Sequence, residues 1–121
     1  MMPTLQITFR NMPVSEAVEA RIRERADALD KFFPNIVSCH VVVESTARQH
    51  VKGKLYYLRV DLAVPGKIIV SKRHPDEHHA HEDIYVAVRD AFDEARRQLE
   101  DYSHRLKGMV KKHRDTERDT E

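Results

Sequence analysis

Apolar and polar residues alternate near the start of the chain and again over a longer stretch in its middle. In residues 5–10 every second side chain is apolar, which is the period of a strand with one buried face. Residues 36–44 are rich in β-branched valine, and residues 55–64 alternate again. Residues 67–72 follow Pro65-Gly66, a pair typical of a tight turn. The pattern therefore predicts four strands.

The same alternation assigns the strand side chains to faces. In the second predicted strand, one face carries Val37, Cys39, Val41 and Val43. In the third, the inward residues are Tyr56, Leu58, Val60, Leu62 and Val64, and the outward residues are Tyr57, Arg59 and Asp61. Residues 45–53 are polar and include Gly53, so they are predicted to form a hairpin connection.

Two further segments have the period of an amphipathic helix. The first begins after Ser15, a favoured N-cap residue, and ends at Pro34. Its apolar stripe consists of Val18, Ile22, Ala26, Leu29 and Phe33. The second runs from Glu82 to about Lys112. Its apolar stripe consists of Ile84, Val88, Ala91, Ala95, Leu99, Tyr102 and Leu106.

The predicted order is β-α-β-β-β-α, an α+β fold in which both helices cover one face of a four-stranded mixed sheet. The first two strands are joined through a helix and should be parallel, whereas the others should pair as antiparallel hairpins. Residues 1–112 are expected to form a single domain. Residues 113–121 have no apolar side chain and are expected to form a charged, disordered tail.

Composition describes a single domain with a highly charged surface. The chain has 21 Lys and Arg residues against 20 Asp and Glu residues, so net charge does not indicate a polyanionic partner. No apolar run is long enough for a membrane span, and the first residues do not resemble a secretion signal. Cys39 is the single cysteine, which excludes an internal disulfide and favours a cytoplasmic protein. We interpret Cys39 as a small core residue, because nothing near it in sequence would lower its pKa.

The distribution of charge along the helices is more informative than the total. On a helical wheel, one flank of the last helix collects Arg89, Arg96, Arg97, His104, Lys107 and Lys111, and the first helix carries Arg21, Arg25 and Lys31. If both flanks line one groove, they form a positive strip suited to a phosphate backbone, and structured RNA is the predicted partner. The alternative is a solvated helix face with internal ion pairs, since Asp93 and Glu100 interrupt the flank.

Motifs for catalysis or for a bound cofactor are absent from the sequence. It has neither a Gly-rich phosphate loop nor a nucleophile elbow, so we predict a protein that is not an enzyme and takes no cofactor or small-molecule substrate. The histidine-rich residues 74–81 do not have a recognised metal-ligand spacing, and a polar loop is the favoured interpretation. Tyr57 is the candidate for stacking on a base, whereas Tyr56 and Tyr85 are expected in the core.

Several short motifs in a matching order resemble one protein family. They are Leu5-Gln6-Ile7-Thr8, Ser15-Glu16-Ala17-Val18, Asp30-Lys31-Phe32-Phe33, His81-Glu82-Asp83-Ile84-Tyr85 and Arg97-Gln98-Leu99. Over residues 5–112 the chain resembles the ribosome hibernation-promoting factors, a family that includes the ribosome-associated translation inhibitor.

The resemblance implies a fold similar to double-stranded-RNA-binding domains and binding to 16S-type rRNA of the small ribosomal subunit. The implied place is between head and body, where mRNA and tRNA would sit. Occupancy there would inhibit translation by steric exclusion and stabilise idle ribosomes in stress or stationary phase. Matching family positions for rRNA contact are Arg25, Lys31 and Arg97. Arg21, Arg89, Arg96, His104, Lys107 and Lys111 join them on the helical wheel alone.

Departures from the family pattern set further expectations. Ala28, Glu94 and Asp101 stand where relatives often have lysine, so we expect weaker binding or a shifted footprint. The chain ends soon after its last helix, so we expect it to lack the ribosome-pairing domain of long members. The alternative function is a protein-interaction module whose RNA surface has decayed.

Overall fold

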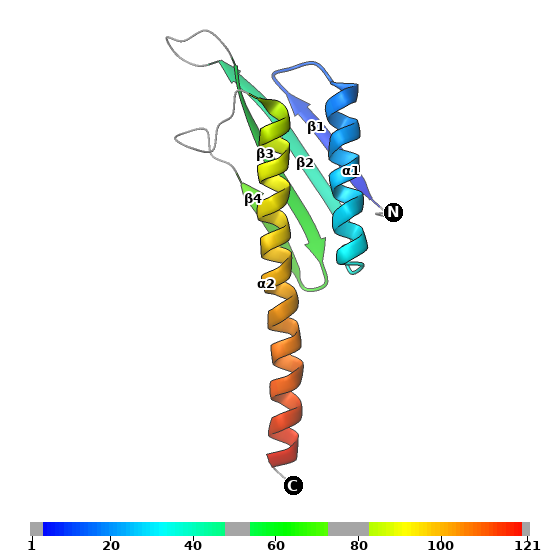
Figure 1. Ribbon diagram of the computed structural model, residues 1–121, viewed down its shortest axis with the longest axis vertical. Coiled ribbons are helices and arrows are strands. Elements are labelled where there is room, and N and C mark those ends of the chain that lie inside the picture. The colour runs from blue at the N-terminus through cyan, green and yellow to red at the C-terminus, as the bar shows by residue number, and fades with distance from the viewer. Residues whose placement is uncertain (1–3, 48–53, 73–82, 120–121) are drawn as a thin grey trace.

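The computed structural model describes residues 4–47, 54–72 and 83–119, and among these the side chains of 46–47, 54, 72 and 108–119 are left aside. The elements in chain order are β1 (Leu5–Arg10), α1 (Glu16–Phe32), β2 (Ser38–Ala47), β3 (Lys54–Val64), β4 (Lys67–Lys72) and α2 (Ile84–Asp119). Figure 1 shows both helices on one side of the sheet, with the C-terminal part of α2 continuing well past the ends of the strands. The predicted α+β order and the two layers are confirmed.

The strands form one sheet in the order β1-β2-β3-β4. β1 and β2 are parallel, with Leu5 beside Cys39, because α1 returns the chain to the end of the sheet at which β1 begins. The β2–β3 and β3–β4 pairs are antiparallel hairpins. Gly66 in the second hairpin has a φ of +78°, a conformation that glycine adopts without strain.

β2 begins and ends later than predicted. Its pairing with β3 continues through Ser45, opposite Tyr56, to Ala47, because the ladder requires only backbone groups and tolerates polar side chains. At the other end, the prediction that Val37 shares the buried face is wrong. Val37 precedes the strand and is 55% exposed, whereas Ile36 is buried. The alternation begins only at Cys39, where the chain has left the end of α1.

α1 forms where its capping and apolar spacing predict. The Ser15 hydroxyl accepts a hydrogen bond from the Val18 N–H at 3.3 Å, which satisfies one free donor of the first turn. At the other end, the Phe33 N–H donates to the Leu29 carbonyl. The buried stripe consists of Val18, Ile22, Ala26 and Leu29.

The core lies between this stripe, the covered face of the sheet and α2. Cys39, at 1% exposure, is part of it. Burial, together with the nearby Asp61 charge, raises the pKa of the Cys39 thiol to about 12. A raised pKa is the opposite of what a reactive thiol needs, so the interpretation of Cys39 as a core residue is confirmed.

Polar contacts attach α2 to the far edge of the sheet. The buried Ser71 hydroxyl of β4 donates to the Ala91 carbonyl at 2.9 Å, and the Gln98 amide donates to the Val70 carbonyl at 3.1 Å. The Tyr102 hydroxyl donates to the Pro65 carbonyl in the β3–β4 turn at 2.7 Å. These bonds fix which side of α2 faces α1.

α2 continues to Asp119, past the end expected near Lys112. The backbone of residues 113–119, expected to be disordered, is helical. Arg114, Glu117 and Arg118 are good helix formers, so the lack of apolar side chains removes packing partners without removing all helix propensity. None of the helices in the described ranges combines the length and the apolar content that crossing a membrane requires.

Candidate nucleic-acid interface

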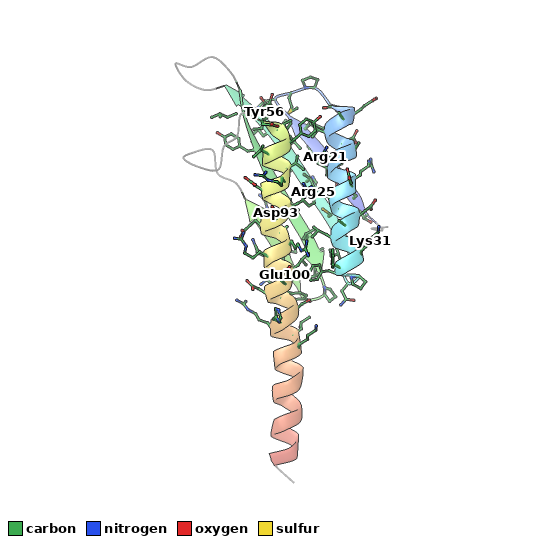
Figure 2. All side chains as sticks on the ribbon, viewed as in Figure 1. Arg21, Arg25, Lys31, Tyr56, Asp93 and Glu100 are labelled. Atoms are coloured by element: carbon green, nitrogen blue, oxygen red, sulfur yellow. The ribbon has the colours of Figure 1, made fainter. Side chains whose placement is uncertain are left out.

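Three arginines converge along the line where α1 and α2 face each other. Arg21 and Arg25 are one turn apart on the flank of α1 beside its buried stripe, and Arg96 lies on the facing flank of α2. Figure 2 places Arg21 and Arg25 between the two helices. We call Arg21, Arg25 and Arg96 the basic seam.

Two arginine–aromatic contacts connect the helices across this seam. The Arg21 guanidinium of α1 lies 5.4 Å from the centre of the Tyr85 ring of α2. In the reverse direction, the Arg96 guanidinium of α2 lies 4.6 Å from the centre of the Phe32 ring of α1. Cation–π contacts at exposed sites contribute about 0.5–1 kcal/mol each, so each contact weakly favours the observed position of its guanidinium group.

A small hollow lies between these two contacts. Its lining includes Arg25, Phe32, Phe92, Asp93 and Arg96. Asp93 is exposed and brings a carboxylate beside the two arginines, so the seam is not uniformly positive. Figure 2 shows Asp93 and Glu100 on the exposed side of α2, beside the seam.

Four of the predicted RNA-binding arginines form ion pairs with carboxylates on their own helix. The distances are 3.7 Å for Arg21–Glu24, 3.1 Å for Arg89–Asp90, 3.2 Å for Arg96–Glu100 and 3.1 Å for Arg97–Glu94. The alternative interpretation, a solvated face with internal ion pairs, is therefore realised in part. These pairs are exposed, and such pairs stabilise a protein by only about 0–1 kcal/mol. A phosphate group can therefore replace the carboxylate with little loss of free energy.

Arg25 differs from these four. Within residues 4–47, 54–72 and 83–119 it has no ion pair, and it is half-buried at the wall of the small hollow. Its guanidinium donors are therefore available to a ligand without breaking an existing bond. Arg25 is the seam residue best placed to hold a phosphate oxygen.

The other predicted site residues lie outside the seam. Lys31 lies on the outer side of α1, away from α2 (Figure 2). Arg97 bonds to Glu94, and Glu94 also accepts from Gln98, which is attached to β4. This network places Arg97 on the side of α2 opposite α1.

The remaining members are spread along α2. Arg89 lies one turn after Tyr85 on the flank that faces α1, and His104 is exposed further along. Lys107 borders a larger hollow near the end of α1. The side chain of Lys111 falls outside the described part of the chain.

Two tyrosines are less or more exposed than the sequence predicts. Tyr57, the candidate for stacking on a base, faces away from the helices as predicted, but it is only 8% exposed there, beside Glu44 of β2. Tyr85, expected in the core, is exposed beneath Arg21. Tyr56 packs against the core as predicted. Alternation identifies a face of the sheet, but neighbouring side chains decide how much of a ring stays accessible.

The sequence interpretation missed Phe32 as a surface residue. Phe32 belongs to the Asp30-Lys31-Phe32-Phe33 motif, yet it is 63% exposed and contacts Arg96. Its spacing from Arg21 and Arg25 places all three on one flank of α1, a signal that the helical wheel contains.

Metal ligation has no support in the described part of the chain, which contains no cluster of three or more potential ligands. The histidine-rich residues 74–81 lie outside the described residues.

Comparison with known proteins agrees with this fold. Residues 5–107 match the family described as sigma 54 modulation protein / S30EA ribosomal protein. A ribosome hibernation promotion factor from Deinococcus radiodurans is 30% identical over 106 residues, which cover 86% of this chain and 51% of that protein. The chain thus spans about half the length of this relative.

Two solved structures share the fold. A ribosomal subunit interface protein from Coxiella burnetii superposes with a TM-score of 0.67 at 15% identity, covering 84% of this chain and 98% of its own. The N-terminal domain of Protein Y from Thermus thermophilus superposes with a TM-score of 0.61 at 18% identity, covering 84% of this chain and 97% of its own. Since the family match spans most of the sequence, this chain belongs to the sigma 54 modulation protein / S30EA ribosomal protein family.

Proposed function

We propose that this protein binds 16S-type rRNA of the small ribosomal subunit, in the channel for mRNA and tRNA, and so inhibits translation. Bound there, it keeps idle ribosomes intact during stress or stationary phase. Membership of a family with a ribosome hibernation promotion factor among its members supports the proposal. The observation that carries it is the convergence of Arg21, Arg25 and Arg96 along one line between the helices.

The mechanism is steric exclusion, and the protein needs only affinity and bulk for it. Each seam guanidinium presents planar donors that can hold two phosphate oxygens. The aromatic rings fix two of these groups before binding, which lowers the entropic cost of ordering them on the ribosome. No bond is made or broken in the proposed activity.

The carboxylates beside the basic seam make the interface selective for one docking geometry. Asp93 and Glu100 repel any phosphate placed over them, whereas Arg25, which lines the same hollow as Asp93, attracts one. Glu94 and Asp101 act in the same way on the other side of α2. The proposed footprint is therefore centred on the seam and excludes the outer face of α2.

Co-sedimentation with purified subunits tests the proposal. The protein should pellet with small subunits and not with large ones, and it should lower the yield of a cell-free translation reaction. Arg96→Glu should weaken pelleting by about ten- to a hundredfold, because a charge-assisted contact is lost and a repulsive one is added. Arg97→Glu, with the same change in net charge, should have a clearly smaller effect. Equal pelleting of parent and Arg96→Glu would contradict the proposal.

A protein-interaction module is the second candidate, and the four arginine–carboxylate pairs favour it. Surfaces whose charges are already paired suit a polar protein interface better than a polyanion. Pull-down from nuclease-treated lysate separates the two functions. A stoichiometric protein partner that survives RNA removal would favour the interaction module.

A further inference from the structure

A second, larger hollow of about 220 Å³ lies at the end of the seam, where α1 ends beside α2. Its floor is apolar and consists of the buried Ile36, Val64 and Leu99. Its rim is different, since Phe32, Ser103 and Lys107 combine an aromatic ring, a hydroxyl and a cation. The volume is below the about 300–1,000 Å³ typical of pockets that enclose a whole small ligand, so it suits one ring.

Phe32 separates this hollow from the small one and lines both. Arg96 lines only the small hollow, so its guanidinium covers the side of the ring that faces there. Phe32 is nevertheless 63% exposed, and it also lines the larger hollow, which Arg96 does not reach. An aromatic face next to an apolar floor, left open to solvent, is available for stacking.

Positive charge lies on both sides of this open ring. Arg96 and Arg25 lie on the side of the small hollow, and Lys107 lies on the rim of the large one. Among the described residues Lys107 has no ion-pair partner, and neither Asn35 nor Ser103, which also border the hollow, has a side-chain hydrogen bond. A ligand that fits has a flat apolar body, a polar edge and a negative charge on either side.

We propose that this hollow receives a single unstacked nucleobase of RNA, held against Phe32, with the flanking phosphates on Lys107 and Arg96. Asn35 and Ser103 are positioned to meet the polar edge of the base. The inference rests on the proposed binding of rRNA and adds to it a contact with a base beyond the phosphate contacts. Single-stranded loops and bulges are the RNA elements whose bases can be splayed out in this way.

An aliphatic side chain of a protein partner would fill the same floor. It would leave the cations on both sides of Phe32 without a role, whereas the phosphates that flank a base can contact Arg96 and Lys107. Charge complementarity therefore favours the base.

Binding of matched oligonucleotides tests the inference. One probe is a single-stranded RNA of about eight nucleotides, and the other is the same chain with its central bases removed, so that the phosphates are unchanged. We expect the intact RNA to bind about tenfold more tightly, which is the ordinary contribution of stacking one base on an aromatic ring. Fluorescence anisotropy at one fixed salt concentration measures both affinities.

Two variants locate the difference. In Phe32→Ala the two RNAs should bind with about equal affinity. Ser103→Leu, which fills the hollow without changing a charge, should have the same effect. Ile68→Ala is the matched control, because Ile68 is an apolar residue of similar exposure, 66%, on the helix-free face. It should leave the difference intact. Thermal unfolding of each variant confirms that it is folded.

The outcomes separate this inference from the proposed function. Equal binding of the two RNAs by the parent, or no binding of either, overturns the base pocket, as does a difference that persists in both hollow variants. If ribosomes are still pelleted in that case, the proposed function stands. Failure to bind both RNA and ribosomes overturns the two together.

Discussion

Arg96 takes part in two contacts that leave much of its guanidinium group accessible. One face lies over Phe32, and the Nε–H donates to Glu100 at 3.2 Å in the plane of the group. The guanidinium has five N–H donors, and the bond to Glu100 uses only the one on Nε. A residue held in this way is ordered and still has donors for a bidentate contact with phosphate.

Cys39 provides a residue-scale prediction about stability and pH. Its pKa is about 12 in the folded protein against 9.0 for an unperturbed thiol. Above pH 9 the unfolded chain loses this proton and the folded chain keeps it, so alkaline pH favours unfolding. Below pH 9 the Cys39 thiol does not change the free energy of unfolding. As the pH rises from 9 towards the folded pKa, this group lowers the free energy of unfolding progressively. At pH 10 the loss should be about 1.4 kcal/mol.

Urea unfolding at pH 8 and pH 10 measures this loss. Tyrosine and lysine also titrate in this range, so Cys39→Ala serves as the reference. The variant is less stable at both pH values because it leaves a cavity, but its own decrease between them should be smaller than that of the parent by about 1.4 kcal/mol. Parallel decreases would show that the thiol is not desolvated.

At the scale of elements, α1 presents arginines on two opposite flanks. Arg25 faces α2 across the small hollow, whereas Arg23 pairs with Glu19 on the other side of the helix. The two positions are two residues apart, which is roughly 200° around a helix. Their substitution changes net charge equally, so they form a matched pair.

Arg25→Glu should weaken co-sedimentation with small subunits by about ten- to a hundredfold, because its charge-assisted contact becomes repulsive. Arg23→Glu should change it by no more than about twofold, the effect expected of a rim charge screened by salt. Sedimentation of both variants at the same subunit concentration measures the ratio. Similar losses would indicate that total charge, and not the placement of Arg25, determines binding.

The whole molecule has a formal net charge of +1, which by itself gives little attraction for RNA. Attraction must come from cations gathered in one place, each releasing a counterion from the phosphate it meets. If the three seam arginines each neutralise one phosphate, the slope of log affinity against log salt should be about −2 to −3. Affinity for small subunits should then fall by roughly thirtyfold between about 50 and 200 mM salt.

Sedimentation across a salt series gives the slope directly. Replacing Arg25 by Gln should make the slope shallower by about one, since one phosphate contact is removed. A slope near zero for the parent protein would indicate that uncharged contacts dominate, which would favour the protein-interaction module.

Sequence alone determined the architecture, because the signals for it are local. The periods of strand and helix, the Ser15 cap and the Pro65-Gly66 turn each specify backbone conformation over a few residues. One helix between the first two strands then makes those strands parallel, and the apolar stripes of both helices are buried together on one face of the sheet. The length of α2 was underestimated, because charged residues that cannot pack still form helix.

Tertiary structure alone decided which charges and rings meet. A helical wheel places Arg96 and Arg97 side by side, but the Gln98–Val70 and Ser71–Ala91 hydrogen bonds between α2 and β4 set the rotation of α2, and of these two arginines only Arg96 faces α1. The fates of Tyr57 and Tyr85 depended in the same way on neighbours from other elements. Period and propensity act within one segment, whereas the rotation of a packed helix is set by contacts between segments that are distant in sequence.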